Sequence, residues 1–464
     1  MRFRIEKDDL GELQVPIEAY YGIQTLRSKQ NFQITKRPIS RQMIKGLATV
    51  KKAAAKANAD AGLLSKEICN AIALSCDEIL NGRLHGQFIT DLIQGGAGTS
   101  MNMNANEVIA NRANEMLGSE KGKYDKVHPI DHVNLCQSTN DVVPTAAKIA
   151  TIRLTKKLIT EMKKLINAYS NKAIEYKDYL TMSKTHLTDN IPITFGQIFS
   201  AQASSIERDM KKIEYALSGM LEISMGGTIT GTGFNADEVY QKKVIKYISQ
   251  YSGEAFVRAK NPVDNLRNLD SFAWLSSAIK VFALNVNNLA TDLRLRSAVF
   301  KTITLPNVQP GSATNPGKIN PVIPEMIKQT VYYVEGNDLT ISRAVSEGEM
   351  DYNVNLPIII SSLFDSIVYI RRAIRTLREK AIEGLVVIDN EYDVTDNATV
   401  ITGILPIIGY EKAQEISQIA SDTNKPIIKI LDEMNIMTIS EIKSAFTKDG
   451  ITTLSLISKT KKED

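Results

Sequence analysis

The stretch SFAWLSSAIKVFALNVNNLATDLRLRS, at residues 271–297, decides which fold this chain of 464 residues can adopt. Its apolar residues recur at helical spacing and occupy more than one face, which predicts a long helix covered on several sides. Five long helices without strands alternating between them predict an extended helical bundle. We also expect a homo-oligomer, because helices with several apolar faces need partner subunits to cover them. The other stretches with a long helical pattern are 158–169, 196–223, 322–344 and about 358–382.

A loop follows that stretch, with the sequence PNVQPGSATNPGKINP at residues 306–321. Four prolines fix φ and two glycines free it, so neither a helix nor a strand can persist here. Ser312, Lys318 and Asn320 place a hydroxyl, a cation and an amide in this loop, a set suited to holding an anion and removing a proton. Clusters of this composition are often only solvated turns. The length of the loop between two helical patterns, with a single lysine in it, favours a functional loop.

Composition and length give the broad organisation of the chain. The length suits about three domains, and we place them at residues 1–139, 140–395 and 396–464. The net charge of +4 is small, and basic residues alternate with acidic ones along predicted helices such as 153–164. This pattern indicates solvated helix surfaces and argues against a nucleic-acid-binding stripe.

Targeting and redox signals indicate a cytoplasmic protein. The N-terminus MRFRIEKDDLGE is charged and unlike a signal peptide, and no apolar run is long enough to span a bilayer. We therefore expect no membrane partner. Cys69, Cys76 and Cys136 form an odd set without CxxC spacing, which is typical of reduced thiols.

A metal site is not predicted. His128 and His132 have the i, i+4 spacing that could hold zinc on a helix. Pro129 lies between them and argues against a continuous helix, and no acidic or cysteine partner set follows. We interpret them as a surface pair.

Polar clusters recur at the ends of the long helical patterns. Thr99 follows the turn GGAG at 95–98, where Thr99 or Ser100 could cap the next helix, and a Gly-rich turn before a helix can bind an anion. The other clusters are QSTND at 137–141, Thr185 with His186, and the 306–321 loop. Taken singly, each has a simpler interpretation: a cap, a turn or a core histidine.

Together these clusters carry a resemblance. The loop GSATNPGKINP resembles the GSSxMPxKxNP signature of the aspartase/fumarase superfamily. QGGAGTSMNMNANEVIANRA, QSTNDVVPTA, THLTDNIPITFGQ and GTGFNAD resemble other regions of the same family in the same order, so the resemblance covers essentially the whole chain. Thr139 in QSTND, the run KINPVIPE and the run GGAGTS are more similar to the aspartase branch than to the fumarase branch. The loop residues that match the signature are Gly311, Ser312, Pro316, Lys318, Asn320 and Pro321.

The resemblance implies a mainly α fold of three mostly helical domains. The central domain would be a five-helix bundle that forms a twenty-helix core in a homotetramer. Each active site would then be built from three subunits, which explains how clusters far apart in sequence can act together.

The resemblance also implies a chemistry, the deamination of aspartate to fumarate and ammonia without a cofactor. Ser312 aligns with the family's base, which removes the C3 proton and leaves an aci-carboxylate with two negative charges. Hydroxyl and amide donors around that group stabilise it. Thr99, Ser138 and Thr139 would hold the β-carboxylate, and Asn140 would lie near the amino group.

The remaining residues of the implied site come from the second half of the chain. Thr185, Lys318 and Asn320 would hold the α-carboxylate. His186 would lie near the amino group, and Glu325 matches the acid that pairs with this histidine and orients it.

The loop departs from the family pattern at two positions, where Ala313 replaces a serine and Asn315 a methionine. The lost hydroxyl would cost about 1–3 kcal/mol if nothing replaced it. Three alternatives therefore stay open: a lyase of the same fold acting on a modified aspartate or another succinyl compound, a fumarase, or a catalytically silent structural homologue. The presence of Ser312, Lys318, Asn320 and His186 argues against silence.

Overall fold

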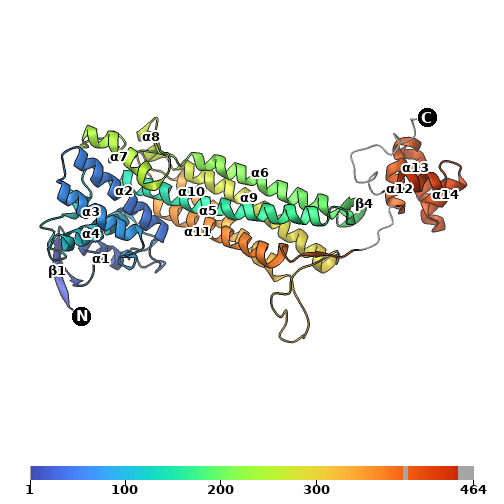
Figure 1. Ribbon diagram of the computed structural model, residues 1–464, viewed down its shortest axis with the longest axis horizontal. Helices are drawn as coiled ribbons and strands as arrows, with labels where there is room; N and C mark the ends of the chain where they lie inside the picture. Colours follow the sequence, from blue (N-terminus) through green and yellow to red (C-terminus); the bar gives the residue numbers. More distant parts are fainter. Residues whose placement is uncertain (1, 390–394, 448–464) are drawn as a thin grey trace. The chain divides into compact units, whose positions relative to one another are not determined.

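Helices dominate the computed structural model, which describes residues 2–389 and 395–447 (Figure 1). The prediction of a mainly α protein is confirmed. The segment expected to be a loop, 306–321, has neither helix nor strand. Among the described residues, no helix is long and apolar enough to cross a membrane.

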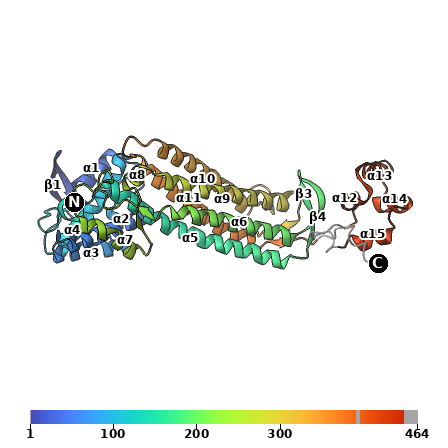
Figure 2. The same ribbon diagram turned by 90° about the horizontal axis from the view of Figure 1, so that it is seen from above.

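Five long helices lie side by side in both ribbon views (Figures 1 and 2). Four of them coincide with predicted long patterns within a few residues, whereas the helix that contains the pattern 158–169 extends well beyond it at both ends. At 271–297 the α-helix stops at Arg294 and a π-helical turn, Leu295–Val299, follows. The five helices are α5 Thr139–Glu175, α6 Phe195–Ser218, α9 Asp270–Arg294, α10 Val322–Ser346 and α11 Leu356–Leu377.

Shorter helices lie before, between and after these five. Before α5 these are α1 Ile23–Asn31, α2 Arg41–Asp60, α3 Lys66–Leu80 and α4 Thr99–Met116, with a π-helical turn η3 at Pro129–Val133. Between α6 and α9 they are α7 Glu238–Ser252 and α8 Pro262–Arg267. After α11 they are α12 Asn397–Ile408, α13 Tyr410–Thr423, α14 Ile427–Glu433 and α15 Ile439–Ala445.

The strands form only two-stranded sheets. Two of these are antiparallel hairpins, β1 Phe3–Asp8 with β2 Gly11–Pro16 and β3 Leu180–Thr185 with β4 Thr188–Thr194. The others are minimal pairs, the parallel β5 Glu222–Ile223 with β6 Val257–Arg258 and the antiparallel β7 Ile303–Thr304 with β8 Val386–Val387. Such small sheets cannot form a core, so helix packing supplies it.

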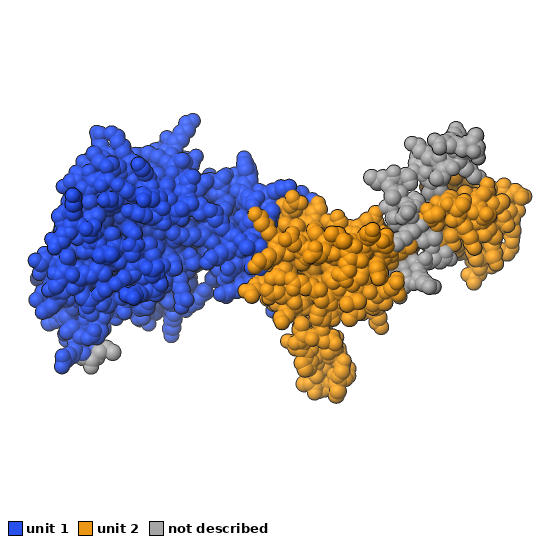
Figure 3. Space-filling view, in the orientation of Figure 1, with its two compact units in different colours: residues 1–162, 208–286, 328–373 blue, residues 163–207, 287–327, 374–464 orange. Residues whose placement is uncertain are grey.

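The chain divides into two compact units, coloured separately in Figure 3. The first comprises residues 1–162, 208–286 and 328–373, and the second comprises 163–207, 287–327 and 374–464. Each unit contains its own stretch of all five long helices. The three domains expected from the sequence, with boundaries at 139 and 395, stay a prediction.

Within the first unit, α2 packs closely against the start of α5. A Cβ added to Gly46 on α2 would lie 2.4 Å from the carbonyl oxygen of Ala146 on α5. Only glycine allows two helix backbones to approach this closely. This contact helps to fix the beginning of α5, which carries the QSTND segment.

A buried carboxylate joins α4 to the N-terminus of α1. Glu107 on α4 accepts hydrogen bonds from the backbone N–H groups of Gly22, Gln24 and Thr25, at 2.9, 2.9 and 3.2 Å. The first turn of α1 has no helical partners for these donors, so a carboxylate there satisfies them. Burial raises the pKa of Glu107 to about 7, against the lowering effect of these donors.

Candidate active site

The helix α4, which follows the GGAG turn, is not capped by the residues that the sequence predicted. Gly98, with φ of 93°, is the N-cap residue, and no side chain caps the helix there, so the expected cap by Thr99 or Ser100 is wrong. Thr99 is instead the first helical residue, and its exposed hydroxyl donates to the carbonyl of Gly96 at 2.7 Å. A Cβ at Gly98 would lie 2.9 Å from Val143 Cγ1, so this turn fits against the start of α5.

At the start of α5, Ser138 is held by hydrogen bonds in both directions. Its Oγ accepts from the N–H of Asn140 at 3.1 Å, and its own N–H donates to Asp141 Oδ1 at 2.9 Å. This is the reciprocal arrangement of a capping box. Because the oxygen of Ser138 is the acceptor, its hydroxyl proton is left to donate to a ligand.

Asn140 has one side-chain N–H bonded within the chain and two oxygen acceptors. Its Nδ2 donates to the carbonyl of Ile229 at 2.8 Å, which orients the amide. Pro144 has no N–H and cannot donate to the Asn140 main-chain carbonyl four residues earlier. Asn140 therefore offers acceptors that suit an ammonium group.

Asp141 is a residue whose importance the sequence analysis missed. It is buried, and its carboxylate accepts from the N–H groups of Ser138, Gly226 and Thr228, at 2.9, 3.1 and 3.1 Å. Burial raises its pKa to about 7, while the N–H donors and the charge of Lys51 oppose that rise. The spacing Ser-x-x-Asp before a helix was the signal that could have identified it.

Thr185 and His186 lie at the turn between β3 and β4. His186 and Leu187 have φ of 52° and 64°, which matches the mirror-image turn favoured in two-residue hairpins. Thr185 Oγ1 accepts from Asn190 Nδ2 at 2.9 Å, so its proton can point outward. His186 is exposed and makes no hydrogen bond or ion pair with any part of the chain that the structure describes.

The 306–321 loop gives Ser312 a particular environment. Its Oγ accepts hydrogen bonds from the backbone N–H groups of Thr314 and Asn315, at 3.2 and 2.9 Å. Two N–H donors aimed at one oxygen stabilise a negative charge on it. This local turn is therefore suited to a serine that acts in its deprotonated form.

Lys318 and Asn320 occupy the other leg of the loop. The N–H of Gly311 donates to the Lys318 carbonyl at 2.9 Å, and Asn320 Nδ2 donates to the Gly311 carbonyl at 2.7 Å. These bonds hold the two legs together. Ser312 and Lys318 line the same hollow, of about 460 Å³, and the Lys318 side chain forms no ion pair among the described residues.

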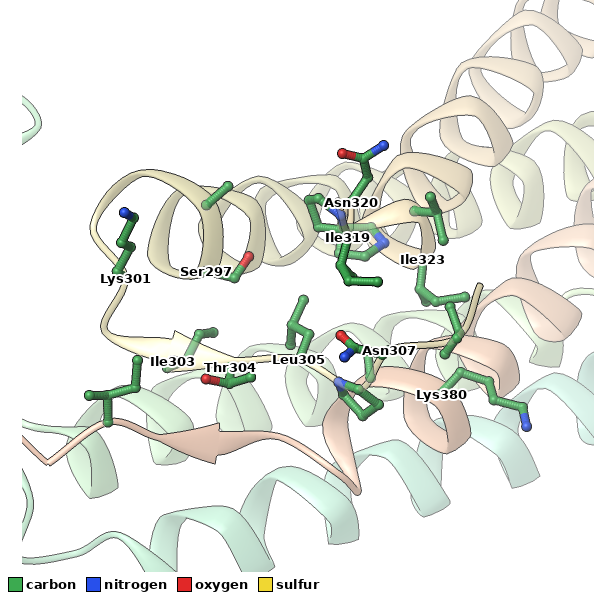
Figure 4. Close-up of a pocket in the computed structure, with 18 residues that line it drawn as sticks. Ser297, Lys301, Ile303, Thr304, Leu305, Asn307, Ile319, Asn320, Ile323 and Lys380 are labelled. Atoms are coloured by element: carbon green, nitrogen blue, oxygen red, sulfur yellow. The ribbon is translucent and has the colours of Figure 1, made fainter. Parts of the chain in front are cut away.

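A second cavity, of about 330 Å³, lies at the base of this loop (Figure 4). Both legs line it, through Leu305 to Val308 on one side and Ile319 to Ile323 on the other. Its lining is largely apolar, so it suits packing of the loop base better than the binding of a charged ligand. Asn320 is the one predicted site residue that borders it.

Glu325, in the first turn of α10, has a different partner from the expected one. Within one chain it forms an ion pair with Arg294 at 3.5 Å, with both side chains about two-fifths exposed. Its pairing with His186 stays a prediction that concerns an assembly of chains. No hydrogen bond or ion pair joins Thr185 or His186 to the loop within the described part of the second unit.

The pair His128 and His132 has a structural role. His132 Nδ1 accepts from the N–H of His128 at 2.9 Å, and His128 Nδ1 accepts from two N–H groups of the π-helical turn that follows. Across residues 2–389 and 395–447, no group of three or more His, Cys, Asp or Glu side chains is arranged to hold a metal ion.

Comparison with known proteins identifies a family. A family model described as Lyase matches residues 11–336. An aspartate ammonia-lyase of Bacillus subtilis is 42% identical over 468 residues, covering 98% of each chain. A fumarate lyase/delta crystallin structure from Brucella melitensis superposes with a TM-score of 0.92 at 36% identity, covering 96% of this chain and 99% of that one. A class II fumarase structure from Schistosoma mansoni has a TM-score of 0.92 at 30% identity, covering 96% and 98%.

The role of Asp141 leads to a stability prediction. Asp141→Ala removes the acceptor for three N–H groups, two of which donate in buried hydrogen bonds, and should lower the free energy of unfolding by about 3 kcal/mol. Asp237→Ala is the matched control, since Asp237 also caps a helix through two N–H groups but is not buried, and its loss should cost about 1 kcal/mol. Thermal unfolding of both variants measures the difference. Equal midpoints would contradict the central role given to Asp141.

Proposed function

We propose, since this chain belongs to the lyase family of the aspartase/fumarase superfamily, that it catalyses the reversible deamination of L-aspartate to fumarate and ammonia. Full-length similarity to aspartate ammonia-lyase supports the substrate. The observation that carries the mechanism is the pair of N–H groups directed at Ser312 Oγ. The chain is thus a carbon–nitrogen lyase with a serine base.

In this mechanism the Ser312 alkoxide takes the proton from C3 of aspartate. The electron pair left behind moves into the β-carboxylate, which becomes an aci-carboxylate with two negative charges. That charge then returns to form the C2–C3 double bond, and ammonia leaves from C2. A serine hydroxyl must lose its proton before it can act as a base. The N–H groups of Thr314 and Asn315, with the cation of Lys318 in the same hollow, favour that loss by stabilising the alkoxide.

The first unit would supply the groups for the β-carboxylate. Thr99, Ser138 and Thr139 hold it with their hydroxyl protons, and the N-terminus of α4 adds a favourable dipole. The Thr99 hydroxyl must first turn away from the Gly96 carbonyl. Asn140 accepts from the amino group, in line with an amide whose N–H₂ already bonds to Ile229.

The second unit would supply the remaining groups. Thr185, Lys318 and Asn320 hold the α-carboxylate through a hydroxyl, a cation and the second proton of an amide. His186 lies near the amino group, and Glu325 from another chain orients its ring. Because no bond joins His186 to the loop within one chain, we propose that three subunits of a homotetramer complete each site.

Apolar side chains on the long helices support this assembly. Tyr332 and Leu339 on α10 and Trp274 on α9 are 55, 65 and 43% exposed. Exposed apolar groups in a row of helices mark a surface that another subunit covers. We extend the proposal to a twenty-helix core in the tetramer. We also propose a cytoplasmic location, because the three cysteines form no disulfide.

A direct assay tests the proposed reaction against its rivals. Purified protein is mixed with L-aspartate, malate or argininosuccinate, and the absorbance of fumarate is followed. Activity on L-aspartate alone supports the proposal. Activity on malate favours a fumarase, activity on argininosuccinate another succinyl lyase, and none on any of them a silent homologue.

Replacement of Ser312 by alanine should abolish most of the turnover. Loss of a catalytic base typically costs several orders of magnitude in kcat. The fold should persist, because Ser312 contributes only a local turn, and circular dichroism checks this. Gln309→Ala, in the same loop, should keep near-normal kcat. Near-normal turnover of Ser312→Ala would remove Ser312 from the role of base.

The assembly can be measured by light scattering at working concentration. We expect a particle of four times the mass of one chain, since the proposed site needs three subunits and closed symmetry favours a tetramer. Dilution should lower the mass and the activity together. A monomer that retains full activity would contradict a site shared between subunits.

The two departures of the loop allow a test of substrate preference. If L-aspartate is the substrate, Ala313→Ser with Asn315→Met should keep or lower its KM, because a hydroxyl donor returns to the β-carboxylate. If the loop is adapted to another β-substituent, the double variant should lose the native activity and gain activity on aspartate. The ratio of kcat/KM for aspartate to that for the best alternative substrate measures the difference. An unchanged ratio would show that both positions are neutral.

A further inference from the structure

A row of buried and half-buried polar groups in the first unit leads to Thr139. It begins at Lys51 on α2, whose side chain is fully buried. Lys51 Nζ donates to Asn134 Oδ1 at 2.8 Å and to Gln137 Oε1 at 2.9 Å, and no carboxylate forms an ion pair with it within the described residues. A buried amino group held by two amide oxygens is costly, so a function should be sought for it.

Lys51 fixes the orientation of the Asn134 amide. The oxygen and nitrogen ends of an amide are difficult to distinguish by shape. Because the amino group of Lys51 donates in these contacts, the oxygen of Asn134 must face it. The nitrogen of Asn134 is consistent with this orientation, because it donates to the Gln137 carbonyl at 3.2 Å. Burial lowers the pKa of Lys51 to about 7, against the charge of Asp141. Both the ammonium and the amine carry the two N–H groups that this arrangement needs.

The orientation of the Asn134 amide in turn fixes that of the Asn102 amide on α4. Asn102 is 2% exposed, and its Nδ2 lies 3.1 Å from Asn134 Oδ1 and 3.3 Å from Thr139 Oγ1. Because Asn134 presents an oxygen, Asn102 must present its NH₂ group there, and the same group then donates to Thr139. Among the described residues, the oxygen of Asn102 is left buried without a hydrogen-bond partner, as is that of Asn106 on the same helix.

We propose that Asn102 is a positioning residue for Thr139, and that buried Lys51 sets its orientation through Asn134. Thr139 Oγ1 accepts from Asn102, so its single proton is directed away from the protein interior and donates to the β-carboxylate as negative charge develops there. Without Asn102 the hydroxyl can rotate and donate elsewhere, which weakens this bond in the transition state. The inference rests on the proposed role of Thr139 in holding that carboxylate.

A double-mutant cycle on kcat/KM for L-aspartate tests this inference. Thr139→Val should lower kcat/KM roughly tenfold or more, and Asn102→Ala roughly tenfold. If Asn102 acts through Thr139, the double variant should be no worse than Thr139→Val alone. In a Thr139→Ser background, where a hydroxyl remains, Asn102→Ala should again cost its full factor.

The outcomes separate this inference from the proposed function. If Thr139→Val leaves kcat/KM unchanged, Thr139 does not hold the substrate, and the positioning role of Asn102 falls with it, while the deamination of L-aspartate stands. If Thr139→Val lowers kcat/KM but the two losses multiply in the double variant, only the positioning role of Asn102 falls. Should Asn102→Ala not fold, Asn102→Asp replaces it in the same cycle, because a carboxylate of the same size would attract the Thr139 proton and give the same coupled loss.

Asn106 offers the matched control. It is fully buried on the same helix and its Nδ2 lies 3.2 Å from the same Asn134 oxygen, but it makes no hydrogen bond to Thr139. Asn106→Ala should lower the unfolding midpoint about as much as Asn102→Ala while kcat/KM stays close to that of the unchanged protein. An equal loss of kcat/KM in both variants would show a general packing effect and overturn the inference.

Lys51→Gln tests the first step of the row. A glutamine amide can present either end to Asn134, so the orientation is no longer enforced and kcat/KM should fall. That fall should disappear in the Asn102→Ala background if Lys51 acts through Asn102. Independent, multiplying losses would remove Lys51 from the proposal.

Discussion

The buried carboxylate of Asp141 is the interaction on which the first unit's part of the site depends. Three backbone N–H groups, from the start of α5 and from the loop at 226–228, converge on it. Without an acceptor these donors would be buried and unsatisfied, so the loop and the helix end have one stable arrangement. Asn140 then meets the Ile229 carbonyl, and its amide oxygen is left for a ligand. The proposed chemistry of this segment therefore follows from satisfying backbone donors.

The same physical device recurs in the second unit at Ser312. There the acceptor is a side-chain oxygen and the donors are two N–H groups of its own loop. In the first unit backbone N–H groups fix a carboxylate, whereas in the loop they would lower the pKa of a hydroxyl. Prolines and glycines at 306–321 prevent a helix or a strand from forming, so these N–H groups remain available to bond to Ser312. In the proposed mechanism, this tight turn prepares a weak acid to act as a base.

Hydrogen-bond direction is the theme that joins the site residues. Ser138, Thr139 and Thr185 each have an oxygen that accepts from a protein N–H group, which leaves the hydroxyl proton available. Asn140 differs, since one of its amide N–H groups is bonded to the Ile229 carbonyl and its oxygen is available. Such a set is suited to a substrate with carboxylates and an ammonium group. A collection of solvated turns would have no reason to share this polarity.

The sequence by itself determined the helical bundle, the irregular loop at 306–321 and the family, because apolar periodicity, prolines and glycines act locally along the chain. It also predicted the segments of the candidate site. Only the tertiary structure decided how those segments are held. The importance of Asp141 and Asn102 escaped notice because their partners, Gly226, Thr228 and Asn134, lie far away in sequence. The cap expected at Thr99 was wrong because Gly98, forced into a positive φ against Val143, takes that position. Hydrogen bonds between distant segments depend on packing, and no local pattern of residues specifies them.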